Sequence, residues 1–163
     1  LPIAGAVYWL LLSIAGLYLS TKAWGFWAFC TSGLIFPLGL LLSKFVKSDL
    51  TYKSSLTNLF LPALLSMMLM FPSAIAAFSI APELVPLILA IGMSVHWPVI
   101  TWAYGIVKVG IGHALIRTIL VTGIWYLFPE YRLTLLPLTV SLVYIGTVPF
   151  FLKEVSKVNR QKS

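Results

Sequence analysis

Arg117 and His96 are the residues of this chain whose types and positions point most clearly to chemistry. Arg117 lies eight residues after Val109 in an otherwise uncharged stretch, which is about 12 Å along a helix. His96 lies eleven residues after Val85 in the preceding stretch, about 16 Å along a helix that would run the opposite way. Both depths are near the middle of a hydrocarbon core of about 30 Å. We therefore expect that the two side chains can meet inside a membrane.

An arginine at this depth needs a partner, because placing it there costs about 2.5–3.5 kcal/mol on insertion scales. The four acidic residues all lie between the apolar stretches, at Asp49, Glu83, Glu130 and Glu154. We therefore expect Arg117 to face backbone carbonyls, water, aromatic rings or an anion that is not protein. A lipid phosphate or a carboxylate ligand would be such an anion.

Two further polar residues extend this candidate ligand-binding site. His113 precedes Arg117 by four residues and shares its helix face, nearer the cytoplasm. Two imidazoles that titrate near neutral pH would also offer a path for protons. Asn58 lies at the expected cytoplasmic mouth of the third apolar stretch, where it either joins the site or forms a hydrogen bond between helices.

A purely structural interpretation of the same residues stays open. Arg117 could extend toward the cytoplasmic headgroups, and His96 could be a core histidine bonded to a backbone carbonyl. Two histidines without a nearby acid or cysteine make a poor metal site, and no carboxylate pair or activated nucleophile is visible. We therefore assign no catalytic residue, no metal and no cofactor. The single cysteine, Cys30, is expected to be a buried, inert thiol.

The elements that would position these residues follow from how rarely charge occurs. Eleven Lys or Arg and four Asp or Glu are spread over 163 residues, hydrophobic residues make up 60%, and the mean hydropathy is +1.01. Such a chain cannot build a water-facing surface, so the bilayer must be its solvent. The charges separate stretches of about 20 residues or more, each long enough to cross the hydrocarbon core. We expect spans at residues 2–21, 23–43, 55–80, 84–105, 109–128 and 133–152.

The predicted fold is therefore all-α, a polytopic bundle of six transmembrane helices that forms a single transmembrane domain over residues 1–163. Prolines interrupt several spans, and Pro72 and Pro98 lie deepest. Because a proline removes a backbone donor, we expect a kink at each, with the carbonyl of Ser94 left without its usual partner. The methionines beside Pro72 suit either an adaptable cavity wall or ordinary packing.

Lys and Arg residues predict the orientation. Eight of them, leaving out Arg117, lie on the side that holds the break at 44–53 and the C-terminal tail, and only two lie on the other side. The positive-inside rule places the basic side in the cytoplasm, and six spans then place both termini there. Aromatic residues at the outer ends of the second and fifth spans, including Trp24 and Trp125, agree with an outer aromatic belt.

The expected partners are the lipid bilayer and, more specifically, its anionic lipids. Their contacts would be Lys44, Lys47, Lys53 and the basic tail 153–163. A homo-oligomer is compatible with this composition. Nucleic acid is not an expected partner, because the basic residues flank spans instead of forming a stripe. A short polar or basic leader is expected before Leu1, and a signal peptide is not, since the first span lacks a basic start and a cleavage site.

Three segments resemble a family of small bacterial integral membrane proteins that has no assigned function. They are FPLGLLLSK at 36–44, TNL at 57–59 and GMSVHWPVITWAY at 92–104. The most specific part is a Gly-x-x-x-His-x-Pro pattern around His96, followed by Trp102 and Tyr104. The resemblance covers roughly residues 1–105 and implies a multi-pass protein of the bacterial plasma membrane. It supports six spans and implies no activity, substrate or catalytic residue.

Three functions stay open from the sequence. The first is binding or transport of a small anionic or polar molecule, or of a lipid headgroup, at the site of His96 and Arg117. The second is a non-catalytic assembly or partner subunit, because the spans use nearly the whole chain. The third is a membrane-embedded enzyme acting on lipid or quinone, with His96 as its mid-membrane acid–base group. An enzyme is less favoured than a binding protein.

Overall fold

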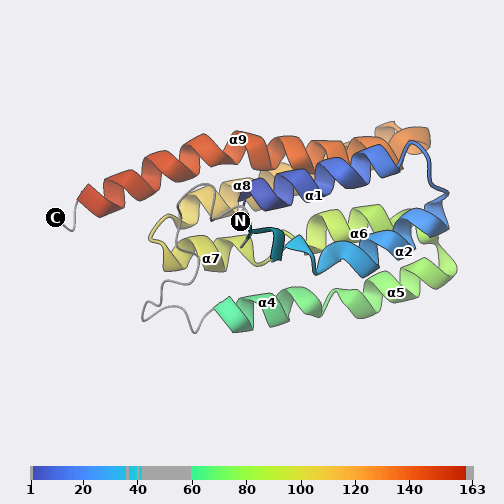
Figure 1. Cartoon of the computed structure of the whole chain (residues 1–163), viewed down its shortest axis with the longest axis horizontal. Helices are drawn as coiled ribbons and strands as arrows, with labels where there is room; N and C mark the ends of the chain where they lie inside the picture. The colour runs from blue at the N-terminus through green and yellow to red at the C-terminus, as the bar shows by residue number, and fades with distance from the viewer. Residues whose placement is uncertain (1, 36, 40, 42–59, 161–163) are drawn as a thin grey trace.

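The computed structural model describes residues 2–35, 37–39, 41 and 60–160, and its helices run along one common axis as an antiparallel bundle (Figure 1). Asn58, Lys44, Lys47, Lys53 and the end of the tail lie outside the described residues. Every element given below is helical. The α-helices are α1 (Pro2–Ala15), α2 (Thr21–Ser32), α4 (Phe60–Met68), α5 (Phe71–Ile80), α6 (Val85–Gly92), α7 (Trp97–Ala103), α8 (Val107–Leu127) and α9 (Arg132–Arg160), with 3₁₀ turns η2 (Pro82–Leu84) and η3 (Pro129–Tyr131).

Four helical stretches within the described residues are long and apolar enough to cross a membrane. They are Pro62–Ile80, Pro82–Ala103, Val107–Leu127 and Pro129–Glu154. They correspond to the last four predicted spans, so the chain is an all-helical membrane protein. The helices within the first two predicted spans are shorter, with 14 residues in α1 and 12 in α2. Ser20 sets the start of α2, because its hydroxyl accepts a hydrogen bond from the amide of Ala23 and caps the helix.

Three consecutive predicted spans are interrupted, each a few residues before a proline. The turn at Gly33 and Leu34 precedes Pro37, the break between α4 and α5 precedes Pro72, and the turn 93–96 between α6 and α7 precedes Pro98. The interruptions lie at about the same level along the bundle (Figure 1). Proline suits the first turn of a helix, where its missing N–H has no partner to lose. Each proline therefore begins a new half-helix.

The backbone groups at the break between α6 and α7 are largely satisfied within the chain. The carbonyl of Ser94, predicted to lose its partner to Pro98, accepts instead from the amide of Trp97 at 3.0 Å. The usual partner, the amide four residues on, is missing as predicted, and a 3₁₀-like turn before the proline supplies the replacement donor. The hydroxyl of Ser94 donates to the carbonyl of Ile91 at 2.6 Å and helps to close the end of α6.

Two of the interruptions pack directly against each other. Gly92 ends α6, and a Cβ on this residue would overlap the sulfur of Met70, the residue just before α5. The absence of a side chain at Gly92 thus lets the thioether fill the space between the two broken spans. Met70 serves as packing filler here, which was one of the two sequence-based interpretations of the methionines.

Helices α1 and α9 pack tightly against each other, because small residues let their backbones approach. Gly5 faces the ring of Tyr144, and a Cβ there would come within 2.8 Å of it. Gly16 faces the carbonyl of Leu133, the group that Pro137 leaves without its helical N–H partner. Serine hydroxyls complete the seam, since Ser141 donates to the carbonyl of Ala6 at 2.8 Å. This packing explains how α9 continues unbroken through a proline.

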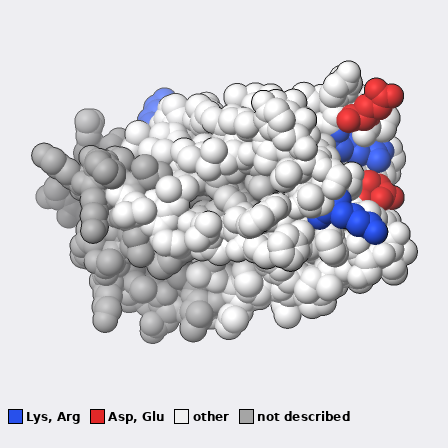
Figure 2. Space-filling model, turned by 45° about the vertical axis from the view of Figure 1, so that its right-hand side comes forward, with Lys and Arg blue, Asp and Glu red and all other residues white. Residues whose placement is uncertain are grey.

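The charged side chains gather at the ends of the bundle. Lys22, Glu83, Glu130 and Arg132 all belong to turns or first helical turns at the end opposite the C-terminus (Figure 1). Figure 2 shows acidic and basic side chains together at one end of this face, beside a wide uncharged surface. Such a distribution suits a bundle whose middle contacts lipid.

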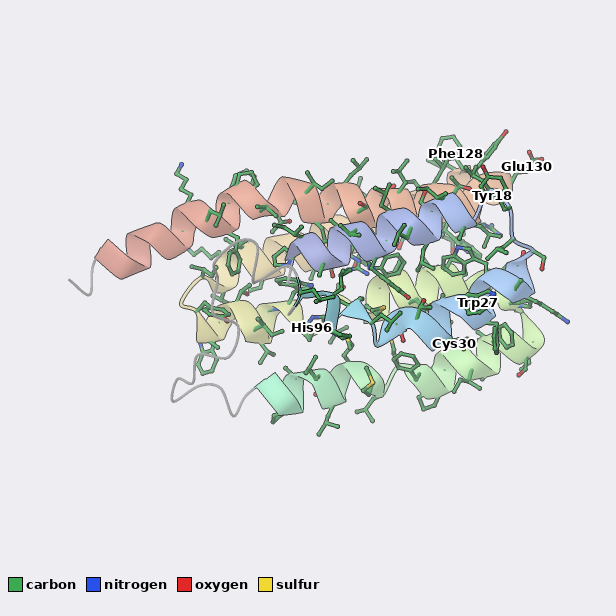
Figure 3. All side chains as sticks on the ribbon, in the orientation of Figure 1. Tyr18, Trp27, Cys30, His96, Phe128 and Glu130 are labelled. Carbon is green, nitrogen blue, oxygen red and sulfur yellow. The ribbon has the colours of Figure 1, made fainter. Side chains whose placement is uncertain are left out.

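Aromatic side chains mark the same end. Tyr18, Trp27 and Phe128 are exposed toward that end of the bundle (Figure 3). Trp24, predicted for the outer belt, is instead buried, because its indole N–H donates to the carbonyl of Leu12 at 2.8 Å.

The expectation that Cys30 is buried was wrong. The inner face of α2 is formed by Trp24, Gly25 and Ala28, and Cys30 is exposed on the outside of the bundle.

Candidate functional site: a buried arginine among aromatic rings

Arg117 points into the bundle and is completely buried, with 0% of its surface exposed. It belongs to a stripe on α8 that also holds Gly110, His113 and Val121, which are the other buried residues of that helix. A side chain extended toward the headgroups would not lose all its exposure. The arrangement is therefore the inward-facing one of the two considered from the sequence.

The arginine is enclosed by aromatic side chains from two other helices. Its Nη1 donates a hydrogen bond of 3.1 Å to the hydroxyl of Tyr144 on α9. Its Cζ lies 5.1 Å from the ring centroid of Trp9 on α1 and 5.4 Å from that of Tyr144. A cation facing aromatic rings in a desolvated place gains about 2 kcal/mol per favourable pair. The rings thus offset part of the cost of burying the charge.

Tyr144 joins three helices through its hydroxyl. Besides the bond from Arg117, it accepts one of 3.1 Å from the indole N–H of Trp97 on α7. Trp97 is placed here because α7 and α8 pack closely: a Cβ on Gly110 would overlap the hydroxyl of Thr101. Pro98 contributes because it is the second residue of α7, and a proline in the first turn favours a helix start at Trp97.

The guanidinium keeps two nitrogens without a hydrogen-bond partner. Nε and Nη2 of Arg117 are both buried and bond to none of the described groups, and the indole nitrogen of Trp9 is in the same condition. Within the described part of the chain, no carboxylate pairs with Arg117, and Glu83 and Glu130 lie at the end of the bundle opposite the C-terminus. Buried donors of a charged group cost several kcal/mol when they stay unpaired. The site therefore has unused capacity for an acceptor.

His113 forms the side of the cluster nearer the start of α8. It is 3% exposed, and its ring centroid lies 4.8 Å from that of Tyr144 and 5.1 Å from that of Trp97. Its Nδ1 is 2.9 Å from the hydroxyl of Thr147, and this hydroxyl donates its one proton to the carbonyl of Val143 at 2.6 Å. Nδ1 must then carry the proton of the neutral ring, which leaves Nε2 as a buried acceptor that bonds to no group in the described part of the chain.

His96 borders the cluster through its contact with Trp97. It stands at the N-cap position of α7, at the level of the helix interruptions, and its side chain makes no capping hydrogen bond (Figure 3). Its ring centroid lies 5.7 Å from that of Trp97, and its buried Nδ1 has no hydrogen-bond partner among the described groups. Trp97 in turn shares Tyr144 with Arg117. The structure thus links His96 to Arg117 through an indole, and no hydrogen bond joins the two.

The remaining residues of the predicted site fall elsewhere. Pro72 lies in the first turn of α5, where it shapes a broken span. Tyr144, Trp9 and Trp97 were missed from the sequence. Tyr144 could have been found, because it lies eleven residues after Leu133 in the sixth span, as deep as His96 in the fourth.

A pocket of about 730 Å³ lies beside the cluster, between the start of α8 and the second half of α9. Its walls are mainly apolar, and His113 and Thr147 are the polar residues shared with the cluster. The described residues that line it are Gly105, Ile106, Val107, Lys108, Val109, Gly112, His113, Ile116, Val143, Gly146, Thr147, Phe150 and Glu154. Gly105 forms the turn into α8 with a φ of 75°, a left-handed conformation that glycine adopts without strain.

Fold and site together define a class: an all-helical membrane protein with a buried cationic cluster near the middle of its bundle. The chain belongs to the family of unknown function DUF7010, which it matches over residues 1–154. The match includes all residues of the cluster and the pocket, and it confirms the predicted membership of a family without assigned function. Comparison with curated proteins gives no match, and neither does comparison with solved structures.

Proposed function

We propose that this protein binds a small anionic or polar molecule, or the anionic headgroup of a lipid, at Arg117 inside the membrane. The observation that carries the proposal is the pair of buried guanidinium nitrogens, Nε and Nη2, that have no acceptor among the residues the structure describes. A cation without a carboxylate partner favours a counter-anion brought from outside the chain. His96 and His113 are the titratable neighbours, since His113 packs against Tyr144 and Trp97, and His96 packs against Trp97.

The free edge of the guanidinium indicates the chemistry of the ligand. Nε and Nη2 form one side of the planar fork, and two parallel donors at this spacing match the two oxygens of a carboxylate or phosphate. Nη1, on the other edge, is engaged by Tyr144 and holds the fork in place. The indole N–H of Trp9 is a further unused donor close by. A planar or tetrahedral oxyanion is therefore favoured over an uncharged ligand.

A stability measurement in detergent tests the proposal and separates the two sources of the anion. The purified protein is melted with acetate, with phosphate, and with phosphatidylglycerol against phosphatidylcholine. A ligand present at a hundred times its Kd raises the free energy of unfolding by about 2.7 kcal/mol. Free anions alone should stabilise the protein if the ligand is a small molecule, and only the anionic lipid should do so if it is a headgroup.

Matched variants show whether the effect belongs to this site. Arg117→Met should abolish the stabilisation, and Lys22→Met, which removes an exposed cation at the outer end, should keep it. The same stabilisation in Arg117→Met, or none with any of these anions, would contradict the proposal.

We further infer that the protein has six spans with both termini in the cytoplasm, in a bacterial plasma membrane. The four long apolar stretches, together with α1 and α2, support this topology, and so does the gathering of Lys22, Glu83, Glu130 and Arg132 at one end. In a Cys30→Ser background, cysteines at Glu130 and Lys108 report the two sides. An impermeant thiol reagent added to intact cells should label the first and not the second. Labelling of both or of Lys108 alone would contradict the orientation.

Transport is a second candidate function, favoured by the three aligned interruptions. Discontinuous helices that meet near the middle of the bilayer are typical of transporter binding sites. Here Met70 and Gly92, at two of the interruptions, pack against each other. Proteoliposomes loaded with radiolabelled acetate or phosphate would release the anion faster than protein-free liposomes with the same load if the protein transports these anions. Release equal to the controls would leave binding without transport.

A further inference from the structure

The pocket between α8 and α9 is separate from the edge of Arg117 that lacks a partner. Arg117 does not line it, and His113 and Thr147 are the polar residues that the pocket shares with the cluster around Arg117. The pocket lies at the end of the bundle where α7 turns into α8, opposite the end that holds Glu130 (Figure 3). Its occupant therefore need not be the ligand proposed for the arginine.

Two glycines, one on each helix, keep this pocket open. A Cβ added to Gly112 on α8 or to Gly146 on α9 would meet no atom within 4 Å. The surrounding walls are the side chains of Ile116, Val143 and Phe150. A volume of about 730 Å³ lies within the range of pockets that hold drug-sized ligands, about 300–1,000 Å³. The inner part of the pocket thus suits an apolar chain.

The charged residues that line the pocket lie at its opening, and less polar residues lie deeper. Lys108 lies in the first turn of α8, and Glu154 lies on α9 beside the same opening. His113 and Ile116 follow along α8 at about 8 Å and 12 Å from Lys108. The pocket therefore runs from a charged mouth at headgroup level into the hydrocarbon core. An occupant that matches this gradient is an amphiphile.

The charge around the mouth selects among amphiphiles. Lys108 and Glu154 line the opening, and in the sequence of α9 Glu154 is flanked by the basic residues Lys153, Lys157 and Arg160. Basic residues next to the end of a span attract anionic lipid by about 1 kcal/mol each. An anionic headgroup is therefore favoured over a zwitterionic one at this opening.

We propose that the pocket between α8 and α9 holds one acyl chain of an anionic phospholipid whose headgroup lies against Lys108. The chain would lie along Ile116, Val143 and Phe150, in the space that Gly112 and Gly146 leave free. Thr147 and His113 at the inner wall border the cluster around Arg117, so a bound lipid supports that cluster from one side. The proposal does not depend on an anion at Arg117.

Filling the pocket tests the proposal directly. Protein reconstituted with equal phosphatidylglycerol and phosphatidylcholine is extracted in mild detergent, and the lipid that stays bound is measured by native mass spectrometry. Gly146→Leu, which fills the pocket, should reduce retained phosphatidylglycerol by about tenfold. The matched control is Gly123→Leu, because Gly123 also has open space around it and does not line the pocket. This control should retain lipid as the natural chain does.

Two further variants separate the headgroup from the chain and from the arginine site. Lys108→Gln should remove the preference for phosphatidylglycerol over phosphatidylcholine while some lipid stays bound. In an Arg117→Met background, where no anion is held at the arginine, Gly146→Leu should still reduce the phosphatidylglycerol that is retained, so failure of the anion proposal would not affect this result. Unchanged retention in Gly146→Leu would overturn the proposal. A dimer mass that Gly146→Leu abolishes would assign the pocket to a second copy instead, and equal retention of both lipids by the natural chain would remove the role of Lys108.

Discussion

Arg117 on α8 donates a hydrogen bond of 3.1 Å to the hydroxyl of Tyr144 on α9, and this is the only hydrogen bond that its guanidinium makes within the described residues. The bond fixes one edge of the fork and leaves the other edge free. Tyr144 therefore positions the cation, and the predictions below begin from this pair.

Tyr144→Phe should lower stability. The variant removes the acceptor for both Arg117 and the indole N–H of Trp97 while it keeps the ring. Leaving such buried donors without an acceptor costs about 1–3 kcal/mol. The free energy of unfolding in a detergent titration measures the loss. Tyr18→Phe, at a tyrosine that is 81% exposed, is the control and should change nothing; equal stability of the two variants would show that the shared hydroxyl contributes nothing.

Arg117→Met should not lower stability in the absence of a ligand. Replacing a buried charged group with an apolar one of similar volume is often neutral or stabilising by about 1–4 kcal/mol. Tyr144 keeps the bond from Trp97 in this variant. Melting temperatures of the two proteins in anion-free detergent give the comparison. A large loss of stability would instead show that the arginine is needed to hold the bundle together.

Gly16→Ala should be destabilising by about 1–3 kcal/mol, the usual cost of overpacking. A Cβ at this position would overlap the backbone carbonyl of Leu133, which cannot move aside as a flexible side chain would. Gly33→Ala offers the matched control, because a Cβ there meets nothing within 4 Å and the backbone is helical. Equal melting temperatures of the two variants would show that α1 does not pack against α9 as described.

Gly92 and Met70 should be energetically coupled. A Cβ on Gly92 meets the flexible end of Met70, so Gly92→Ala should cost stability and Met70→Ala should relieve part of that cost. Residues in direct contact show coupling energies of about 0.5–3 kcal/mol in double-mutant cycles. The four melting curves of the cycle measure the coupling. Additive effects would mean that the two interrupted spans do not meet at this level.

The pattern of charge was sufficient to predict a helical membrane protein, because few polar groups interrupt its apolar stretches. Depth counting also singled out Arg117 correctly as a residue of the bundle's middle. It could not show which way the side chain points, since Trp9 and Tyr144 come from stretches far away in the sequence and only packing brings them together. Aromatic rings are uncharged, so the pattern of charge in the sequence does not identify them as partners of an arginine.

Other differences between the sequence-based predictions and the structure have local causes. In the sequence, Trp24 looks like a tryptophan at the membrane interface, because it lies near the end of a predicted span. Its hydrogen bond to the carbonyl of Leu12 shows that it is in the core. Pro98 predicts a break, but the tight turn that satisfies Ser94 depends on the four residues before it. Pro137 carries the same signal and causes no break, because Gly16 and the rest of α1 cover the disturbed turn.

The two indoles beside Arg117 give the protein a built-in optical reporter. Trp9 lies over the cation and Trp97 is bonded to its tyrosine, so both fluorophores experience the field of one positive charge. An anion that neutralises this charge changes that field and hence the colour of their emission. Phenylalanine replacements of Trp27 and Trp102, which are exposed, would reduce the background from the surface. Occupancy of the site can then be followed by light in an unlabelled protein.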